Sequence, residues 1–269
     1  MSDPRPISEL NAKNIIGLFF DIDDTFSTRG KITPEAYSSI WRLKEAGKLV
    51  VPVTGRPAGW CDHIARMWPV NAVIGENGAL YFIMKNGRLV KKYAADKKKR
   101  AEYEKRLAAI RDEILKDVKG TALASDQDYR EFDLAIDFCE DVPHIGEKGI
   151  DKMVEIAKEH GAVVKVSSIH VNIWFGDHTK LTTTKLFVKN ELGMDMDKDN
   201  ERFAFCGDSG NDEPMFEYFK NSIGVANVMN FKGRMKKFPE FITKKESGGG
   251  FVEVVEKICS CPIHRVTWD

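Results

Sequence analysis

The sequence lacks long apolar stretches. Its first residues, MSDPRPISEL, contain no apolar run of the kind that forms a signal peptide. No segment approaches the roughly 20 apolar residues that are needed to cross a bilayer. Cysteine is also scarce, because five residues scattered over 269 do not form the dense framework of a disulfide-rich protein. The sequence therefore predicts a cytoplasmic protein with reduced thiols and no membrane partner.

An excess of charge of either sign is lacking as well. The 41 basic residues balance the 41 acidic ones, so the formal net charge is zero. This balance gives no reason to expect nucleic acid or an anionic membrane as a partner. Near the C-terminus, Cys259, Cys261 and His264 offer three soft metal ligands, but a second pair elsewhere is missing, so they are a weak zinc signal.

What the sequence does contain is an alternation of short apolar runs with helical stretches. Strands separated by helices predict an α/β fold with a doubly wound parallel sheet, as in Rossmann-like domains. Thr33 and Pro34 have the form of a helix N-cap and first turn, and Gly47 marks the end of that helix. Pro52 cannot donate a ladder hydrogen bond, so we expect an irregularity there. The strands predicted in this part are 14–20, 48–54 and 71–83, with a hairpin completed by 87–93.

From about residue 94 to residue 177 the pattern is that of a separate α+β domain with an antiparallel sheet. The elements predicted there are helices 96–118 and 147–160 and strands 131–138, 162–168 and 170–175. After residue 178 the doubly wound pattern returns, with helices 181–192, 212–220 and 249–258 and strands 202–207 and 222–227. We therefore predict a Rossmann-like core formed by residues 1–87 and 178–269, with an inserted α+β cap domain, residues 88–177.

Three aspartates directly follow the first predicted strand. Asp21, Asp23 and Asp24 place like charges at nearly adjacent positions, which repel one another and give no reason of their own to gather. Asp208 follows another strand of the same predicted sheet. Because ligands of open α/β sheets lie outside the carboxyl ends of the strands, Asp21, Asp23 and Asp208 can converge there. Three carboxylates with carbonyls and waters form an oxygen site suited to Mg²⁺.

Further polar residues lie at the same predicted edge. Thr54 ends the second strand and precedes Gly55 and Arg56, which form a tight turn. Each signal is weak alone, since acidic turns and T-G-R triplets also occur as plain solvated loops. Their common position at strand ends favours a site. The other candidates are Lys180 and Lys185 near the start of a helix, and Asn211 and Asp212 in the turn after Asp208.

These motifs resemble those of the haloacid dehalogenase-like phosphatases. That family has D-x-D-x-T after the first strand, a strand-end Thr or Ser, a Lys, and an acidic G-D-x-x-N-D motif, which correspond here to 21–25, Thr54, Lys180 and 207–212. The inserted α+β cap and GENGALYF (75–82) are similar to the subgroup of Cof-type, sucrose-phosphate and trehalose-phosphate phosphatases. The family often has Gly after its lysine, whereas Leu181 follows Lys180, so Lys185 stays a second candidate.

The resemblance implies hydrolysis of a phosphate monoester through an aspartyl phosphate. Asp21 would be the nucleophile and Asp23 the general acid and base, while Thr54 would bind a phosphoryl oxygen. Lys180 and Mg²⁺ would neutralise the dianion. The residues expected to bind the metal are Asp21, Asp23 and Asp208, and those expected to bind phosphate or support the site are Thr54, Gly55, Arg56, Asn211 and Asp212.

Other functions stay open at this point. A sugar-phosphate mutase would share the whole apparatus, whereas a receiver domain would need only about half of this chain and no cap. The expected partner is a small phosphorylated metabolite such as a sugar phosphate, but the sequence does not identify it. Cap residues that could face the substrate are Asp126, Tyr129, His170, Asn172 and Trp174, of which Trp174 fits a core position better.

Overall fold

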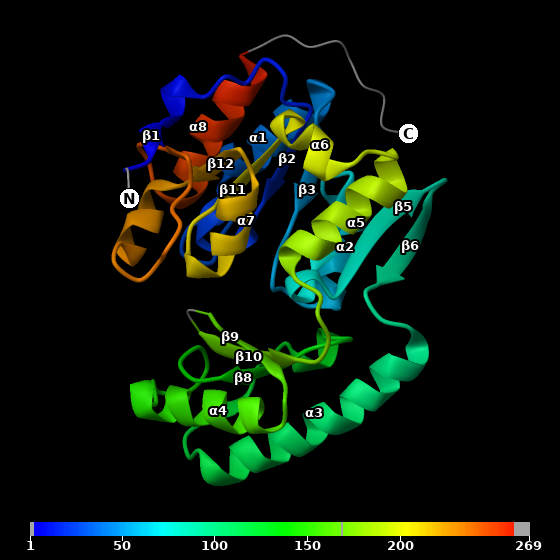
Figure 1. The fold of residues 1–269 in the computed structure, drawn as a ribbon, viewed down its shortest axis with the longest axis vertical. Coiled ribbons are helices and arrows are strands. Elements are labelled where there is room, and N and C mark those ends of the chain that lie inside the picture. Colours follow the sequence, from blue (N-terminus) through cyan, green and yellow to red (C-terminus); the bar gives the residue numbers. More distant parts are fainter. Residues whose placement is uncertain (1–2, 168, 261–269) are drawn as a thin grey trace.

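A six-stranded parallel sheet forms the centre of the core (Figure 1). The structure is a computed structural model and describes residues 3–167 and 169–260. Strands from the two ends of the chain lie side by side in this sheet, because β2 pairs with β11 and with β3. In spatial order the strands are β1 (Arg5–Pro6), β13 (Phe241–Ile242), β12 (Asn221–Gly224), β11 (Phe203–Gly207), β2 (Gly17–Phe20) and β3 (Leu49–Pro52).

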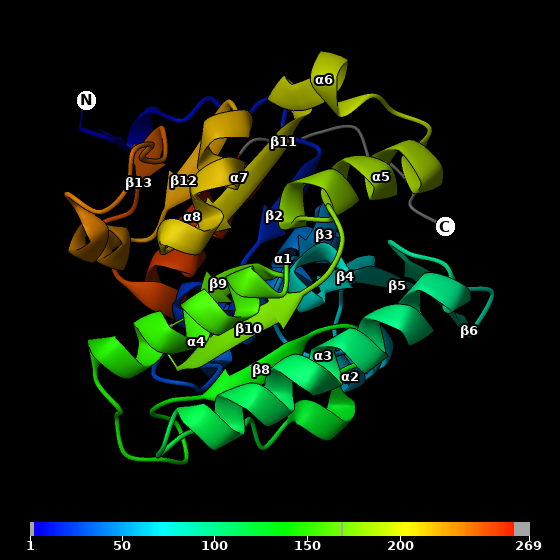
Figure 2. The same ribbon diagram turned by 60° about the horizontal axis from the view of Figure 1, so that its bottom comes forward.

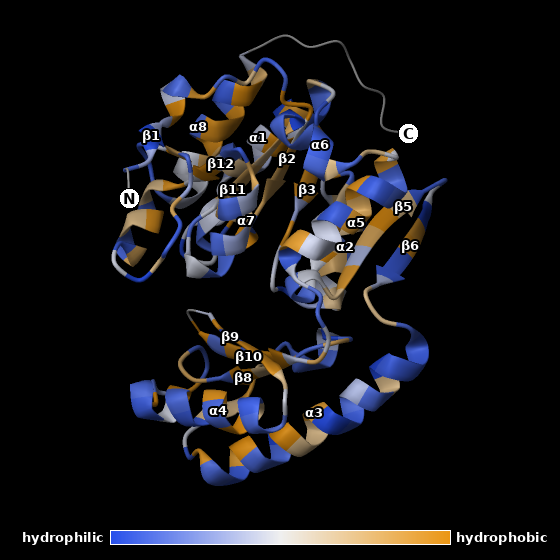
Figure 3. Ribbon diagram, in the orientation of Figure 1, coloured by the Kyte–Doolittle hydropathy of each residue, from blue (hydrophilic) through white to orange (hydrophobic). Residues whose placement is uncertain are grey.

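Helices cover both faces of this sheet, which confirms the predicted doubly wound fold. Side chains of a strand alternate between the faces: Leu18 and Phe20 pack in one apolar cluster with α8, and Phe19 packs in the other against Phe187 of α5. The strands are buried on both sides and are therefore largely hydrophobic (Figure 3). One face carries α1 (Pro34–Glu45), α2 (Ala58–Met67) and α8 (Ser247–Cys259), and the other carries α5 (Lys180–Leu192) and α7 (Glu213–Tyr218), with the short α6 (Met196–Asp199) beyond α5.

A second, three-stranded antiparallel sheet continues from the core. It consists of β4 (Ala72–Gly75), β5 (Leu80–Lys85) and β6 (Arg88–Tyr93), so the predicted hairpin is present. An isolated parallel bridge between Val53 and Ile74 links it to the end of β3, and the N–H groups of Thr54 and Asn71 donate to the carbonyls of Ile74 and Val50. Pro52 ends β3 at this point. The N–H groups of Leu49 and Val53 donate to the carbonyls of Ile16 and Phe20, so the nitrogen of Pro52 faces away from β2 and interrupts no hydrogen bond of that pairing.

The inserted segment forms a four-stranded antiparallel sheet with two helices packed on one face (Figure 2). Residues Ile136, Val171 and Ile173 of this sheet pack against Ile110 and Met153 of the helices. The opposite face of the sheet is turned toward the core (Figure 1). The strands, in order, are β7 (Ala122–Leu123), β8 (Leu134–Asp137), β10 (His170–Trp174) and β9 (Val163–Val166), and the helices are α3 (Lys97–Asp117) and α4 (Glu147–Glu159).

The chain passes from β6 into α3 and returns from β10 to α5, so both connections run at the same side of the core. Within the described ranges, the helices are either too short or too polar to cross a bilayer. Cys259 is the last residue of α8 and is partly buried, whereas Cys261 and His264 of the possible zinc signal lie outside the described residues.

Candidate active site

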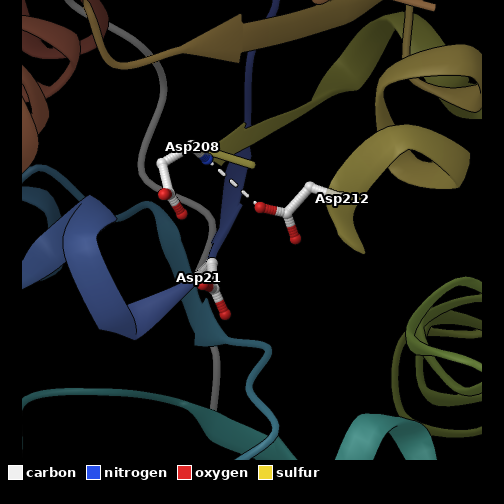
Figure 4. A group of neighbouring side chains, drawn as sticks. All are labelled: Asp21, Asp208 and Asp212. Atoms are coloured by element: carbon white, nitrogen blue, oxygen red, sulfur yellow. Dashed lines mark hydrogen bonds between the residues drawn. The ribbon is translucent and has the colours of Figure 1, made fainter. Parts of the chain in front are cut away.

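Three buried aspartates converge where the parallel strands end (Figure 4). Asp21 follows β2, Asp208 follows β11, and Asp212 lies in the turn before α7. Because β2 and β11 are neighbours in the sheet, their carboxyl ends meet, and the N–H of Asp21 donates to the carbonyl of Cys206 at 2.9 Å. One carboxylate oxygen from each aspartate lies within 4.8 Å of the other two. The N–H of Asp208 also donates to Oδ2 of Asp212 at 3.1 Å, which ties the turn to the strand end.

Lys180 is the cation of this cluster. Its Nζ donates to Oδ1 of Asp21 at 2.8 Å and to Oδ1 of Asp212 at 2.9 Å, and the side chain is buried. Burial opposes its charge, but the two carboxylates outweigh that effect and raise the pKa of Lys180. Lys185, the second candidate, instead pairs with Asp197 on the surface.

The negative charge of the three carboxylates exceeds the positive charge of Lys180. Burial raises the pKa of Asp21, the charge of Lys180 lowers it, and the charge of Asp212 raises it again. The pKa of Asp21 is thereby raised to about 7. Burial together with the charges of Asp212 and Asp21 raises the pKa of Asp208 to about 9. Three carboxylates thus face one ammonium group, and a divalent cation among their oxygens would remove the imbalance. A set of hard oxygen donors fits Mg²⁺.

Two residues that were not predicted individually support Asp208. The hydroxyl of Thr25, the last residue of the first motif, donates to Oδ1 of Asp208 at 3.0 Å and is fully buried. Asn227 donates from Nδ2 to the carbonyl of Asp24 at 3.0 Å and lies 3.4 Å from Oδ2 of Asp208. Asn227 follows β12 (Asn221–Gly224), so the available signal was a polar residue at the end of the predicted strand 222–227.

Asp23 lies apart from the acid cluster and binds Arg56. Both Nε and Nη2 of Arg56 donate to its carboxylate, at 3.0 Å and 2.7 Å, in a two-pronged ion pair. The Asp23 side chain is 41% exposed, so it borders open space. The group of described acids placed to share a metal is Asp21, Asp208 and Asp212. The metal role of Asp23 therefore stays a prediction.

The remaining predicted residues lie around this edge. Thr54 is buried after β3, and its hydroxyl accepts from the N–H of Arg56 at 3.0 Å. A Cβ at Gly55 would lie 3.2 Å from the amide oxygen of Asn77, so a side chain there would require Asn77 to shift slightly. Asn211 accepts from the hydroxyl of Ser209 at 2.9 Å, so it shapes the turn beside the acid cluster.

The cap is fastened to the core next to these residues by Glu76, which was not predicted. Its carboxylate accepts from the backbone N–H groups of Ala58, Glu131 and Asp133 at 2.8, 2.9 and 3.0 Å. Burial, followed by the charge of Asp133, raises the pKa of Glu76 to about 8. Glu76 belongs to the segment 75–82 that the sequence indicated as the linker into the cap, and its position explains why an acid stands there.

The five cap residues proposed from the sequence occupy two places. Along β10, Val171 and Ile173 pack against the helices of the cap. The residues that alternate with them, His170, Asn172 and Trp174, are buried on the opposite face of the sheet, which is turned toward the core domain. Asp126 lies 4.0 Å from Arg56. Tyr129 is 59% exposed and contacts Gly59 of α2 at the rim, so it lies outside the face of the sheet.

The structure thus combines a doubly wound core, buried acids and a lysine at its strand ends, and an α+β cap. Residues 18–113 match the family model described as haloacid dehalogenase-like hydrolase. The match covers the first two of the four motifs and agrees there with the resemblance found in the sequence. A search of curated proteins found no match.

Solved structures share the fold over nearly the whole chain. A protein of Thermoplasma acidophilum superposes with a TM-score of 0.71 at 19% identity, over 91% of this chain and 98% of that one. The C-terminal domain of Candida albicans trehalose-6-phosphate phosphatase gives 0.70 at 14%, over 96% and 99%. The sucrose-phosphatase of Synechocystis, solved with sucrose and phosphate, gives 0.63 at 16%, over 91% and 98%. These similarities confirm the predicted fold, a doubly wound core with an α+β cap.

Proposed function

We propose that the protein is a magnesium-dependent phosphatase that hydrolyses a small phosphorylated metabolite, with a sugar phosphate as the preferred class. The observation that carries the proposal is the pairing of Asp21 with buried Lys180 inside a cluster of acids that is short of positive charge. Trehalose-6-phosphate phosphatase and sucrose-phosphatase, which have the same fold, support the substrate class. We also propose that residues 1–87 and 178–269 form the core domain and that residues 88–177 form the cap domain.

Asp21, Asp208 and Asp212 would hold Mg²⁺, which supplies positive charge next to the phosphoryl oxygens. Asp21 attacks phosphorus in line, the bond from phosphorus to the ester oxygen breaks, and an aspartyl phosphate forms. Lys180 fixes the orientation of Asp21 and lowers the repulsion between the carboxylate and the phosphate dianion.

Asp23 is the proton donor and acceptor of the reaction. It gives its proton to the departing alkoxide, and it then takes a proton from the water that attacks the aspartyl phosphate, so inorganic phosphate leaves and Asp21 is restored. Arg56 holds the Asp23 side chain in one orientation at the open side of the site. The hydroxyl of Thr54, which follows the adjacent strand β3, would donate a hydrogen bond to a phosphoryl oxygen.

The test is release of inorganic phosphate from p-nitrophenyl phosphate and from a panel of sugar phosphates. We expect turnover with Mg²⁺, loss of turnover with a chelator, and recovery when Mg²⁺ is added back. Full activity in chelator would refute the metal site. Isomerisation of a sugar phosphate without phosphate release would show a mutase instead.

A further inference from the structure

Arg56 connects Asp23 of the core with Asp126 of the cap. Its Nε and Nη2 bind the carboxylate of Asp23, and its Nη1 lies 4.0 Å from Oδ2 of Asp126 on the other side. Cζ of Arg56 also lies 4.4 Å from the centroid of the Trp60 ring, within the range of a cation–π contact. Two carboxylates and one aromatic ring therefore restrict the rotation of the Arg56 side chain.

The orientation of Asp23 depends on Arg56. In the described part of the chain, the hydrogen bonds to the carboxylate of Asp23 come from Arg56, and the Asp23 side chain is 41% exposed. A side chain with so few contacts has several staggered conformers open to it. The ion pair with Arg56 selects one of them. Whatever fixes Arg56 therefore also fixes the direction in which Asp23 presents its carboxyl oxygens.

Asp126 is held in place by Arg130, whose side chain is only 2% exposed. Nε and Nη2 of Arg130 donate to the two carboxylate oxygens of Asp126 at 3.1 and 3.3 Å. Nη1 of Arg130 donates to Oδ1 of Asp133 at 2.8 Å and to the carbonyl of Gly55 at 3.2 Å. Because Gly55 directly precedes Arg56 in the sequence, Arg130 fixes the cap acid relative to the backbone of the arginine that it faces.

The cap loop that carries Asp126 is ordered by its own hydrogen bonds. The side-chain amide of Gln127 donates to the carbonyl of Asp133 at 3.0 Å and accepts from the N–H of Ala135 at 2.8 Å. Glu76 of the core binds the far end of the loop through backbone N–H groups. Because the loop is ordered in this way, Asp126 loses little conformational freedom when it faces Arg56.

We propose that Asp126 of the cap is a positioning residue for the reaction: through Arg56 it holds Asp23 in the orientation in which Asp23 protonates the leaving oxygen. Asp126 needs no contact with the substrate for this role. The inference rests on the proposed phosphatase function and adds a cap residue to the groups that govern proton transfer. The general acid of the core is then complete only while the cap loop lies against Gly55 and Arg56.

The experiment compares Asp126→Asn with the wild-type protein on two esters of similar shape, phenyl phosphate and p-nitrophenyl phosphate. Phenolate is the more basic leaving group and gains more from protonation by Asp23. We expect kcat to fall about fivefold for phenyl phosphate and less than about twofold for p-nitrophenyl phosphate, with KM nearly unchanged for both. The ratio of the two kcat values is the readout, because partial unfolding of the variant would lower both equally.

The matched control is Asp128→Asn. Asp128 lies two residues further along the same loop and is exposed. The control removes the same charge from the same loop, and we expect it to leave kcat for both esters unchanged. A change of the kcat ratio as large as in Asp126→Asn would mean that the general charge of the loop matters and not its contact with Arg56, and would overturn the inference.

A double-mutant cycle tests whether Asp126 acts through Arg56. Arg56→Lys already removes the two-pronged ion pair with Asp23. In that background, Asp126→Asn should therefore lower kcat for phenyl phosphate by less than about twofold, because the two changes affect one pathway. A loss as large as in the wild-type background would show that Asp126 acts independently of Arg56 and would refute its positioning role.

The outcomes separate the two levels of the proposal. If Asp126→Asn keeps the wild-type ratio of the two kcat values, or changes KM alone, the role of Asp126 is refuted while the phosphatase function stands. If the wild-type protein with Mg²⁺ releases no phosphate from any ester, both the function and the inference fail.

Discussion

The core sheet and the cap sheet differ in how many of their faces are covered. Helices pack on both faces of the core sheet, so its strands are hydrophobic throughout and leave chemistry only to the residues that follow their ends. Helices pack on one face of the cap sheet only, so alternate residues of β10 lie on the other face, which is turned toward the core, and are buried there. Under the proposed function, the reacting groups would lie at the strand ends of the core, and the cap would cover them with one face of its sheet.

The two regions also differ in electrostatics. At the core strand ends, burial and neighbouring acids raise the pKa of Asp21 to about 7 and that of Asp208 to about 9, which indicates a need for a cation. Between core and cap, the guanidinium groups of Arg56 and Arg130 are matched by carboxylates. The proposed Mg²⁺ would balance the charge of the first region, whereas ion pairs between arginines and carboxylates already balance much of the charge of the second.

The largest effect is expected at the nucleophile in the core. Asp21→Asn keeps the shape of the side chain but removes the attacking charge, so kcat should fall by about 10⁴-fold or more. Asp24→Asn is the matched control: it lies in the same turn with a φ of 53°, a conformation that Asn tolerates, and its side chain is exposed. Steady-state phosphate release should separate the two variants, and similar losses in both would contradict the role of Asp21.

The next effect separates the two lysines of helix α5. Lys180→Met leaves Asp21 and Asp212 as buried acids without their cation, so we expect a loss of about 3 kcal/mol in stability and a loss of activity of about 10³-fold. Lys185→Met removes only an exposed ion pair with Asp197 and should leave both nearly unchanged. Chemical denaturation and turnover measure both effects. An inactive Lys185 variant beside an active Lys180 variant would reverse the assignment.

A smaller effect concerns the stability of the metal-free protein as a function of pH. The pKa values of Asp21 and Asp208 are raised in the folded state, to about 7 and about 9, so the folded protein binds their protons more tightly than the unfolded chain. Their contribution to stability is full below about pH 4 and is lost as pH rises through these values. In chelator, Tm should therefore fall between pH 5 and pH 8.

Mg²⁺ and one variant sharpen that measurement. Mg²⁺ should raise Tm more at pH 8 than at pH 5, because protons compete with the metal for the carboxylates. Asp208→Asn should make the decline of Tm in chelator shallower without abolishing it, since Glu76, with its pKa raised to about 8, contributes in the same direction. A Tm in chelator that rises over this interval would contradict the charge imbalance.

The smallest effect tests the boundary between core and cap. Arg56→Lys keeps the charge but loses the two-pronged ion pair with Asp23, so we expect kcat to fall about tenfold for an alkyl phosphate. The loss should be smaller for p-nitrophenyl phosphate, whose leaving group needs little protonation. Equal losses for both esters would mean that Arg56 does not act through Asp23.

The core site could be predicted because its parts are local in the sequence. Each motif follows a strand directly, and parallel strands bring their ends to one edge, so Asp21, Thr54 and Asp208 had to lie near one another. Lys180 and Lys185 could not be separated in this way. The structure starts helix α5 at Lys180, after the N-cap Thr179, and the turn of the helix carries Lys185 to the surface.

The link between core and cap could not be predicted. Arg130 donates to the carbonyl of Gly55, 75 residues away in the sequence, and Glu76 binds backbone groups of the cap 55 and 57 residues away. Contacts of this kind depend on how two separately folded units meet, and periodicity within a strand or helix does not report it. For the same reason the sequence placed Tyr129 among the candidates for the substrate face, whereas it lies at the rim.

The central claim is that the carboxylate of Asp21 becomes phosphorylated during turnover. The most direct measurement is acid quench of the enzyme during turnover with Mg²⁺, reduction of any acyl phosphate with borohydride, and peptide mass spectrometry. The account predicts homoserine at position 21 and nowhere else, and its absence when the Asp21→Asn variant is treated in the same way. Phosphate found on a serine, threonine or histidine, or homoserine at another aspartate, would contradict it.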